Sequence, residues 1–155
     1  MIRTGLIATL LVSASPGAAE SLVGEWHCIQ DGPEVRVEAD TRIEGDGAFT
    51  AEMEFTLIGP NGRLTVTAIY AAEWMQNGDA FVASPLGAKI TGVFLDGEKT
   101  EAPQIAQNIL RSLQAPSDTP MQIDFDGPDV VFFRSWDGNG APFECIRADG
   151  DTIGL

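Results

Sequence analysis

The feature that most constrains the fold of this chain is a strict alternation of apolar and polar residues between short turn sequences. Across residues 49–57, odd-numbered positions hold apolar side chains and even-numbered positions hold Thr or Glu. A period of two is typical of a β-strand with one buried and one solvated face. The turn Gly-Pro-Asn-Gly at 59–62 follows, and the alternation resumes over 63–74. Since Asn-Gly is the strongest short hairpin signal, these segments predict a β-hairpin.

Weaker strand patterns, separated by turns rich in Asp, Asn and Gly, occupy most of the remaining chain. They cover residues 22–29, 35–43, 80–84, 89–95, 121–125, 130–136 and 143–147. About eight short strands joined by tight turns predict a mainly β fold. We therefore expect an antiparallel up-and-down barrel or a strongly curved sheet, in a single domain that spans residues 20–155.

One segment, residues 103–114, breaks the β pattern and predicts an amphipathic helix. Its apolar side chains at positions 105, 109, 110 and 113 recur at helical spacing, with polar residues on the opposite side. Pro103 suits the first turn of a helix, and Thr100 is the expected N-cap. We expect the apolar stripe to lie over the sheet or across a barrel mouth.

The first nineteen residues have the pattern of a cleavable signal peptide. Arg3 precedes an apolar run over 5–12, and small residues lead to a cleavage site between Ala19 and Glu20. The apolar run is much shorter than the ~20 residues that span a bilayer, so no membrane insertion is expected after cleavage. The sequence thus predicts a periplasmic or secreted protein.

The balance of charges narrows the range of partners. The chain has 23 acidic and 9 basic residues, with a formal net charge of −14. Such a surface repels nucleic acid and anionic lipid, and it favours solubility, a cationic ligand or a basic partner. We expect no nucleic-acid partner.

Two cysteines lie near opposite ends of the predicted domain. Cys28 belongs to the first predicted strand and Cys145 to the last. An even cysteine count in an oxidising compartment predicts one disulfide, and no Cys-x-x-Cys redox motif is present. If the sheet closes, these strands are neighbours and the two Cα atoms lie within about 4.4–6.8 Å.

No pattern in the sequence predicts a catalytic or metal site, and we expect no cofactor. His27 is the only histidine and has no accompanying triad motif. The loop at Asp137 has Ala141 where an EF-hand needs an oxygen ligand, so it predicts a turn. The alternation places Glu52 and Glu54 in solvent. Hydrolysis by a carboxylate pair stays open, because such a pair is spaced in three dimensions.

Four large side chains are expected to point into the sheet interior. They are Met53, Phe55, Tyr70 and Trp74. These residues would contact a ligand if the interior is hollow, and they would form a core if it is filled. Eight strands enclose an interior just wide enough for side chains or for one small ligand. On those dimensions we expect the filled core.

The opening strand, with Gly24 and Trp26 in a Gly-x-Trp motif, resembles the first strand of lipocalin-like (calycin) barrels. The resemblance covers this motif and the strand rhythm. It implies that a basic residue of the last strand packs over the Trp ring, and Arg147 is the matching residue. The predicted helix precedes the last strands, whereas lipocalins carry theirs after the barrel. Small periplasmic barrels that inhibit secreted metalloproteases also resemble this chain in size, motif and disulfide.

These observations lead to one principal hypothesis and two alternatives. The first is a non-enzymatic exported domain that binds a small apolar or amphipathic molecule, or a periplasmic protein, in lipocalin fashion. The second is a periplasmic protease inhibitor that acts through a loop or terminus. The third is a hydrolase with a carboxylate pair.

Overall fold

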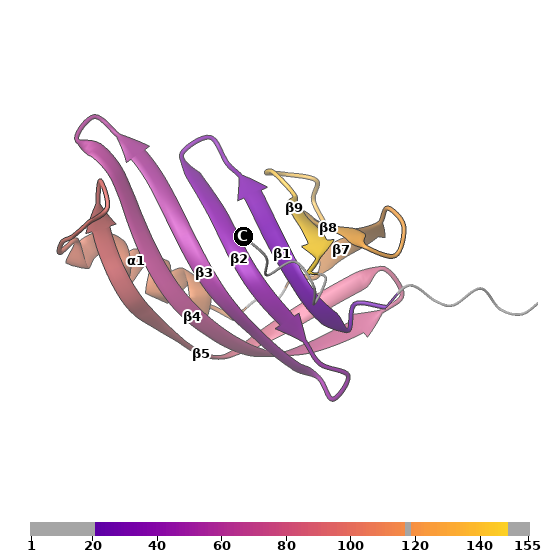
Figure 1. Ribbon diagram of the computed structural model, residues 1–155. Helices are drawn as coiled ribbons and strands as arrows, with labels where there is room; N and C mark the ends of the chain where they lie inside the picture. Colours follow the sequence, from indigo (N-terminus) through magenta and orange to yellow (C-terminus); the bar gives the residue numbers. More distant parts are fainter. Residues whose placement is uncertain (1–20, 117–118, 149–155) are drawn as a thin grey trace, which may run out of the picture.

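The computed structural model describes residues 21–116 and 119–148, and within them antiparallel strands dominate (Figure 1). The predicted signal peptide over 1–19 lies outside the described residues. The strands are β1 (Gly24–Asp31), β2 (Val35–Ile43), β3 (Ala48–Gly59), β4 (Gly62–Asn77), β5 (Ala80–Leu95), β6 (Glu98–Lys99), β7 (Met121–Phe125), β8 (Val130–Ser135) and β9 (Phe143–Arg147), and the helix is α1 (Pro103–Gln114).

The strands form one antiparallel sheet that curves into a ring. Apart from the short β6, each strand pairs with its successor in the chain, and β1 pairs with β9. The prediction of a mainly β, up-and-down arrangement is therefore confirmed. The ring is not a regular barrel, because β5 and β7 share only two pairs, Ala80 with Gln122 and Phe81 with Met121.

The predicted hairpin is confirmed as β3 and β4, which pair without interruption from Ala48 opposite Glu73 to Gly59 opposite Gly62. Alternation along β3 has the expected effect on burial. Ala51 is buried on the inner face, whereas Glu52 and Glu54 are exposed on the outer face. The Pro-Asn tip lies between the two strands, where Gly62 adopts the positive φ of 122° that favours glycine.

The prediction of separate strands over 80–84 and 89–95 is wrong, since β5 continues through the residues between them. Proline cannot donate to a ladder, and in sheets it occurs at edges and bulges. Pro85 lies where the register against β4 shifts, so that Leu86 is the extra residue on β5. A second shift makes Thr91 extra. Such bulges bend a strand, which allows β5 to follow the curve of the ring.

The predicted helix is confirmed as α1, which packs against β5 and lies behind β4 and β5 in Figure 1. The predicted cap is wrong. The N-cap is Ala102, without a side-chain hydrogen bond. Thr100 is still part of the turn around β6, because its backbone N–H donates to the carbonyl of Val93 at 2.9 Å. No residue of α1 is fully buried, so the helix covers the sheet from outside the main core.

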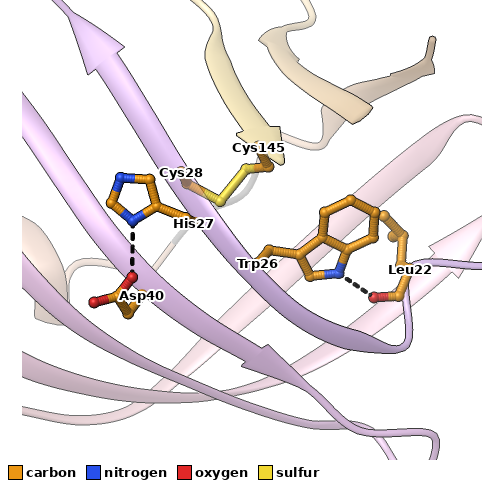
Figure 2. Close-up of a disulfide and its surroundings, with 6 residues drawn as sticks. All are labelled: Leu22, Trp26, His27, Cys28, Asp40 and Cys145. Carbon is orange, nitrogen blue, oxygen red and sulfur yellow. Dashed lines mark hydrogen bonds and ion pairs between the residues drawn. A yellow bond between two sulfur atoms is a disulfide. The ribbon is translucent and has the colours of Figure 1, made fainter. Parts of the chain in front are cut away.

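The core of the ring lies where the two ends of the described chain meet. Its largest fully buried side chains include Leu22, Trp26, Ile43 and Val131. The predicted disulfide joins β1 to β9 there (Figure 2). The Cα atoms of Cys28 and Cys145 lie 4.0 Å apart, slightly closer than expected, because the residues are direct cross-strand partners. No helix of the described residues is long and apolar enough to span a membrane.

Candidate ligand-binding cavity

The interior of the ring contains a partly open cavity of about 300 Å³. Part of the interior is filled as expected, because Met53 and Trp74 pack against a buried cluster that includes Phe81. Inner-face residues of β1–β5 form one side of the cavity, and β7–β9 with the C-terminal end of α1 form the other. The described residues that line it are all uncharged: Trp26, Cys28, Ala39, Thr41, Ile43, Phe49, Ala51, Met53, Tyr70, Phe81, Ala83, Pro85, Ser112, Leu113, Ala115, Thr119, Met121, Phe133, Phe143 and Cys145.

Small side chains explain why the centre is not filled. Ala39, Ala51 and Ala83 line the cavity from three different strands. A ring of about eight strands is just wide enough for large side chains to fill it, so alanine on several strands leaves space. The cavity thus reflects a deficit of side-chain volume on the inner face.

The four predicted interior residues divide into two pairs. Met53 and Tyr70 line the cavity. Trp74 does not line it, because its indole stacks on Phe81 at 6.0 Å and its Nε1 donates to the carbonyl of Glu44 at 2.9 Å. Phe55 lies two residues beyond Met53 on the same face of β3, outside the lining.

Thr41 is a lining residue that the sequence interpretation missed. It is only 6% exposed, and it is the single buried polar residue among those described. It stands opposite Ala51, which in turn stands opposite Tyr70, so the three form one row across β2, β3 and β4. The signal was present in the sequence, since alternation from Val37 to Ile43 places a threonine on an otherwise apolar face.

Tyr70 brings a second hydroxyl to the cavity. Its ring is half-buried and meets Phe49 edge-on, with centroids 6.0 Å apart. Burial raises the pKa of the Tyr70 phenol above its ordinary value, because the phenolate loses hydration. Tyr70 is therefore a neutral hydrogen-bonding group over the whole physiological pH range.

Titration of this phenol gives a direct test, because Tyr70 is the only tyrosine of the chain. Absorbance titration of the folded protein is expected to give a midpoint above pH 10, against about 10 in urea. The unfolded chain then ionises first as pH rises, so this contribution to stability is complete below about pH 10 and is lost above it. Tyr70→Phe should remove that part of the pH dependence. Equal midpoints in the folded and unfolded protein would contradict the burial of the phenol.

Trp26, which lines the cavity, belongs to the Gly24, Trp26 and Arg147 arrangement that the lipocalin resemblance implied. The guanidinium carbon of Arg147 lies 4.2 Å from the Trp26 ring centroid, which confirms the expected contact. Arg147 also donates to the carbonyls of Ser21 and Val23 at 2.9 and 3.0 Å. Gly24 has a φ of 143°, and a Cβ there would collide with the Arg147 guanidinium. The motif therefore positions an arginine across a buried indole.

The outer face of the sheet carries the ionisable groups. A wider, open groove of about 730 Å³ crosses it, with Asp40, Arg42, Glu52 and Lys89 among its lining residues. Four residues line both this groove and the cavity: Trp26, Thr41, Ala51 and Tyr70. His27 lies on this face, where its Nδ1 and an oxygen of Asp40 are 2.8 Å apart (Figure 2). That carboxylate is the imidazole's one side-chain partner within the described part of the chain, so no hydroxyl or thiol nucleophile accompanies it there.

The calcium-like loop at Asp137 is closed by its own hydrogen bonds. The Asp137 carboxylate accepts from the hydroxyl of Ser135 and from the backbone and side-chain N–H groups of Asn139. These bonds, chiefly the one from Ser135, lower the pKa of Asp137. Within residues 21–116 and 119–148, no group of three His, Cys, Asp or Glu side chains is placed to hold a metal ion. The loop is a turn, as the sequence indicated.

Comparison with known proteins adds no family assignment. No family model matches the chain, and no curated protein matches it significantly.

Proposed function

We propose that this protein binds a small apolar or amphipathic molecule in the cavity of its β-ring. The observation that supports this proposal is a partly open cavity of about 300 Å³ in the ring interior, whose described lining residues are all uncharged. Small-molecule sites occupy about 300–1,000 Å³ and are lined mainly by apolar and aromatic side chains with a few polar groups. The cavity has that character and lies at the small end of the range.

Ligand binding also accounts for an interior left unfilled. A well-packed interior would be more stable, because each missing methylene forfeits apolar burial and van der Waals attraction. The small side chains of Ala39, Ala51 and Ala83 make fewer van der Waals contacts at three inner positions than larger side chains would make. A ligand that occupies the space would supply it and would stabilise the folded protein in proportion to its affinity.

Filling the cavity by mutation is the test of this proposal. Ala51→Leu places a larger apolar side chain at the centre of the lining, between Thr41 and Tyr70. We expect the variant to fold and to bind a fluorescent naphthylamine probe at least about tenfold more weakly, which corresponds to about 1.4 kcal/mol of binding free energy. Titration of probe fluorescence measures the change.

The matched control is Ala71→Leu, which adds the same side chain to the residue that follows Tyr70 on β4. Ala71 belongs to the outer groove and not to the cavity. This variant should bind the probe like the wild type. If both variants bind the probe as tightly as the wild type does, the cavity is not its binding site.

We further propose that the protein works outside the cytoplasm, in the periplasm or as a secreted protein. The Cys28–Cys145 disulfide supports this location, because disulfides persist in oxidising compartments. The signal-peptide pattern over 1–19 agrees with it. The protease-inhibitor hypothesis stays a prediction.

A further inference from the structure

We propose that the cavity takes an uncharged molecule with one hydrogen-bonding group, such as an alcohol, ketone or ester, and that it rejects fatty acids and other ions. The inference rests on the proposed binding function and specifies its ligand class. Two observations support it: the described residues of the lining carry no charge, and two of their hydroxyls stand in one row of the sheet without a protein partner among the described residues.

The absence of charge from the lining argues against an ionic ligand. None of the twenty described lining residues is Asp, Glu, Lys, Arg or His. A carboxylate carried into this interior would lose its hydration and find no cation in return, which is a heavy penalty. The net charge of −14 opposes an anion further during its approach. A neutral molecule incurs neither the desolvation penalty nor the electrostatic repulsion.

The Thr41 hydroxyl is evidence that the occupant is not a pure hydrocarbon. Thr41 is only 6% exposed, and its hydroxyl bonds to none of the described residues. No fully enclosed side-chain oxygen or nitrogen of the described residues lacks a hydrogen-bond partner. The remaining accessible surface of Thr41 therefore includes its hydroxyl oxygen, and Thr41 lines both the cavity and the outer groove.

Tyr70 adds a second hydroxyl of the same kind. Its phenol also bonds to none of the described residues, and its side chain lines the same cavity. Buried polar groups are nearly always paired in folded proteins. The buried Thr41 hydroxyl therefore indicates a polar group on the occupant, and the half-buried Tyr70 offers a second hydroxyl at the same cavity.

Both hydroxyl-bearing residues lie in the same row of the sheet. Thr41 and Tyr70 are separated by a single strand, with Ala51 between them in the same row. Strands lie about 4.8 Å apart, so the two Cα atoms are about 10 Å apart across the row. The small Ala51 side chain leaves the space above it open. Ser112 is already engaged, because its hydroxyl donates to the carbonyl of Asn108 at 3.0 Å.

The experiment compares three probes that share one hydrocarbon chain: decanol, methyl decanoate and decanoate. The full chain, exported so that its disulfide forms, is titrated with each by calorimetry at neutral pH. We expect decanol and methyl decanoate to bind, and decanoate to bind at least about a hundredfold more weakly because its charge is unpaired. Decanoate that binds as tightly as decanol overturns the inference.

Two conservative variants test the anchoring groups. Thr41→Val and Tyr70→Phe keep the shape of each side chain and remove its hydroxyl. Each is expected to weaken decanol binding about three- to tenfold, the usual worth of one hydrogen bond. Affinities unchanged from the wild type in both variants would overturn the anchoring role. Circular dichroism of each variant verifies that the β-ring is folded.

The failure of this inference is distinguishable from failure of the proposed function. If decanoate binds and Ala51→Leu abolishes that binding, the cavity is a binding site for a different ligand class, and only this inference fails. If neither the naphthylamine nor any of the three decyl probes binds the wild type, the proposed function fails, and the ligand class fails with it.

Discussion

Replacing Cys28 with Ser is expected to lower the free energy of unfolding by about 2–5 kcal/mol, the usual cost of losing a native disulfide from a small exported domain. The bond joins residues 117 apart in sequence and ties β1 to β9, the first and last described strands. Without it, the unfolded chain gains conformational freedom. A loop of about 100 residues corresponds to about 4.7 kcal/mol in the chain-entropy model. Urea denaturation at fixed pH measures the change.

The same bond is absent from every variant, so the expected pattern is non-additive. Cys145→Ser should cost as much as Cys28→Ser, and the double mutant should cost no more. The corresponding Ala variants control for the hydroxyl that Ser introduces at these buried positions. Cys145 is 1% exposed and Cys28 is 6% exposed. Two reactive thiols in the unfolded, unreduced wild type would contradict the disulfide, as would a double mutant with twice the effect of either single.

Truncating Trp26 to Ala is expected to cost about 3–5 kcal/mol of unfolding free energy, because it removes a large side chain from the core. The residue is 1% exposed, and its Nε1 donates to the carbonyl of Leu22 at 2.7 Å. Its ring also contacts Arg147, a contact worth about 0.5–2 kcal/mol. The truncation therefore removes burial, a hydrogen bond and a cation–π contact together. Thermal or urea unfolding gives the magnitude.

Two substitutions control for the size of this effect. Trp26→Phe keeps an aromatic ring under Arg147 but leaves the Leu22 carbonyl without its donor, so an intermediate cost is expected. Trp136 is 53% exposed, and Trp136→Ala should change stability by no more than about 0.5 kcal/mol. If Trp26→Ala were as mild as Trp136→Ala, Trp26 would not be a central core residue.

The elements that stabilise the ring most are also part of the cavity. Trp26 and both cysteines line it, and Arg147 packs over the indole. Sites built on rigid elements hold their geometry better than sites on loops. Leu113 and Ala115 differ from these residues, because they come from α1 and its end, where no helix residue is fully buried. The cavity is thus lined mainly by strands, with the less buried helix end at one place.

Local pattern was sufficient for much of this fold. The hairpin of β3 and β4 followed from strict alternation and an Asn-Gly turn, which are properties of neighbouring residues. The pairing of β1 with β9 followed from the two cysteines, because a disulfide requires close Cα atoms. The placement of Arg147 over Trp26 followed from the motif resemblance.

Long-range packing decided what local pattern left open. Turn-like residues around Pro85 suggested a break, yet bulges at Leu86 and Thr91 carry β5 through it, because its pairing with β4 outweighs the local preference. The N-cap shifted from Thr100 to Ala102 for a related reason, since the turn around β6 engages the Thr100 backbone.

The candidate site shows most clearly which features follow from local pattern and which follow from long-range packing. Alternation determines that Ala51, Tyr70 and Thr41 face inward, because successive side chains of a strand point to opposite faces. It does not determine that these residues share a row, which depends on the register of three strands. Nor does it determine whether the interior is filled. That depends on the summed volume of side chains from all the strands and on where the ring closes, and only the assembled structure fixes both.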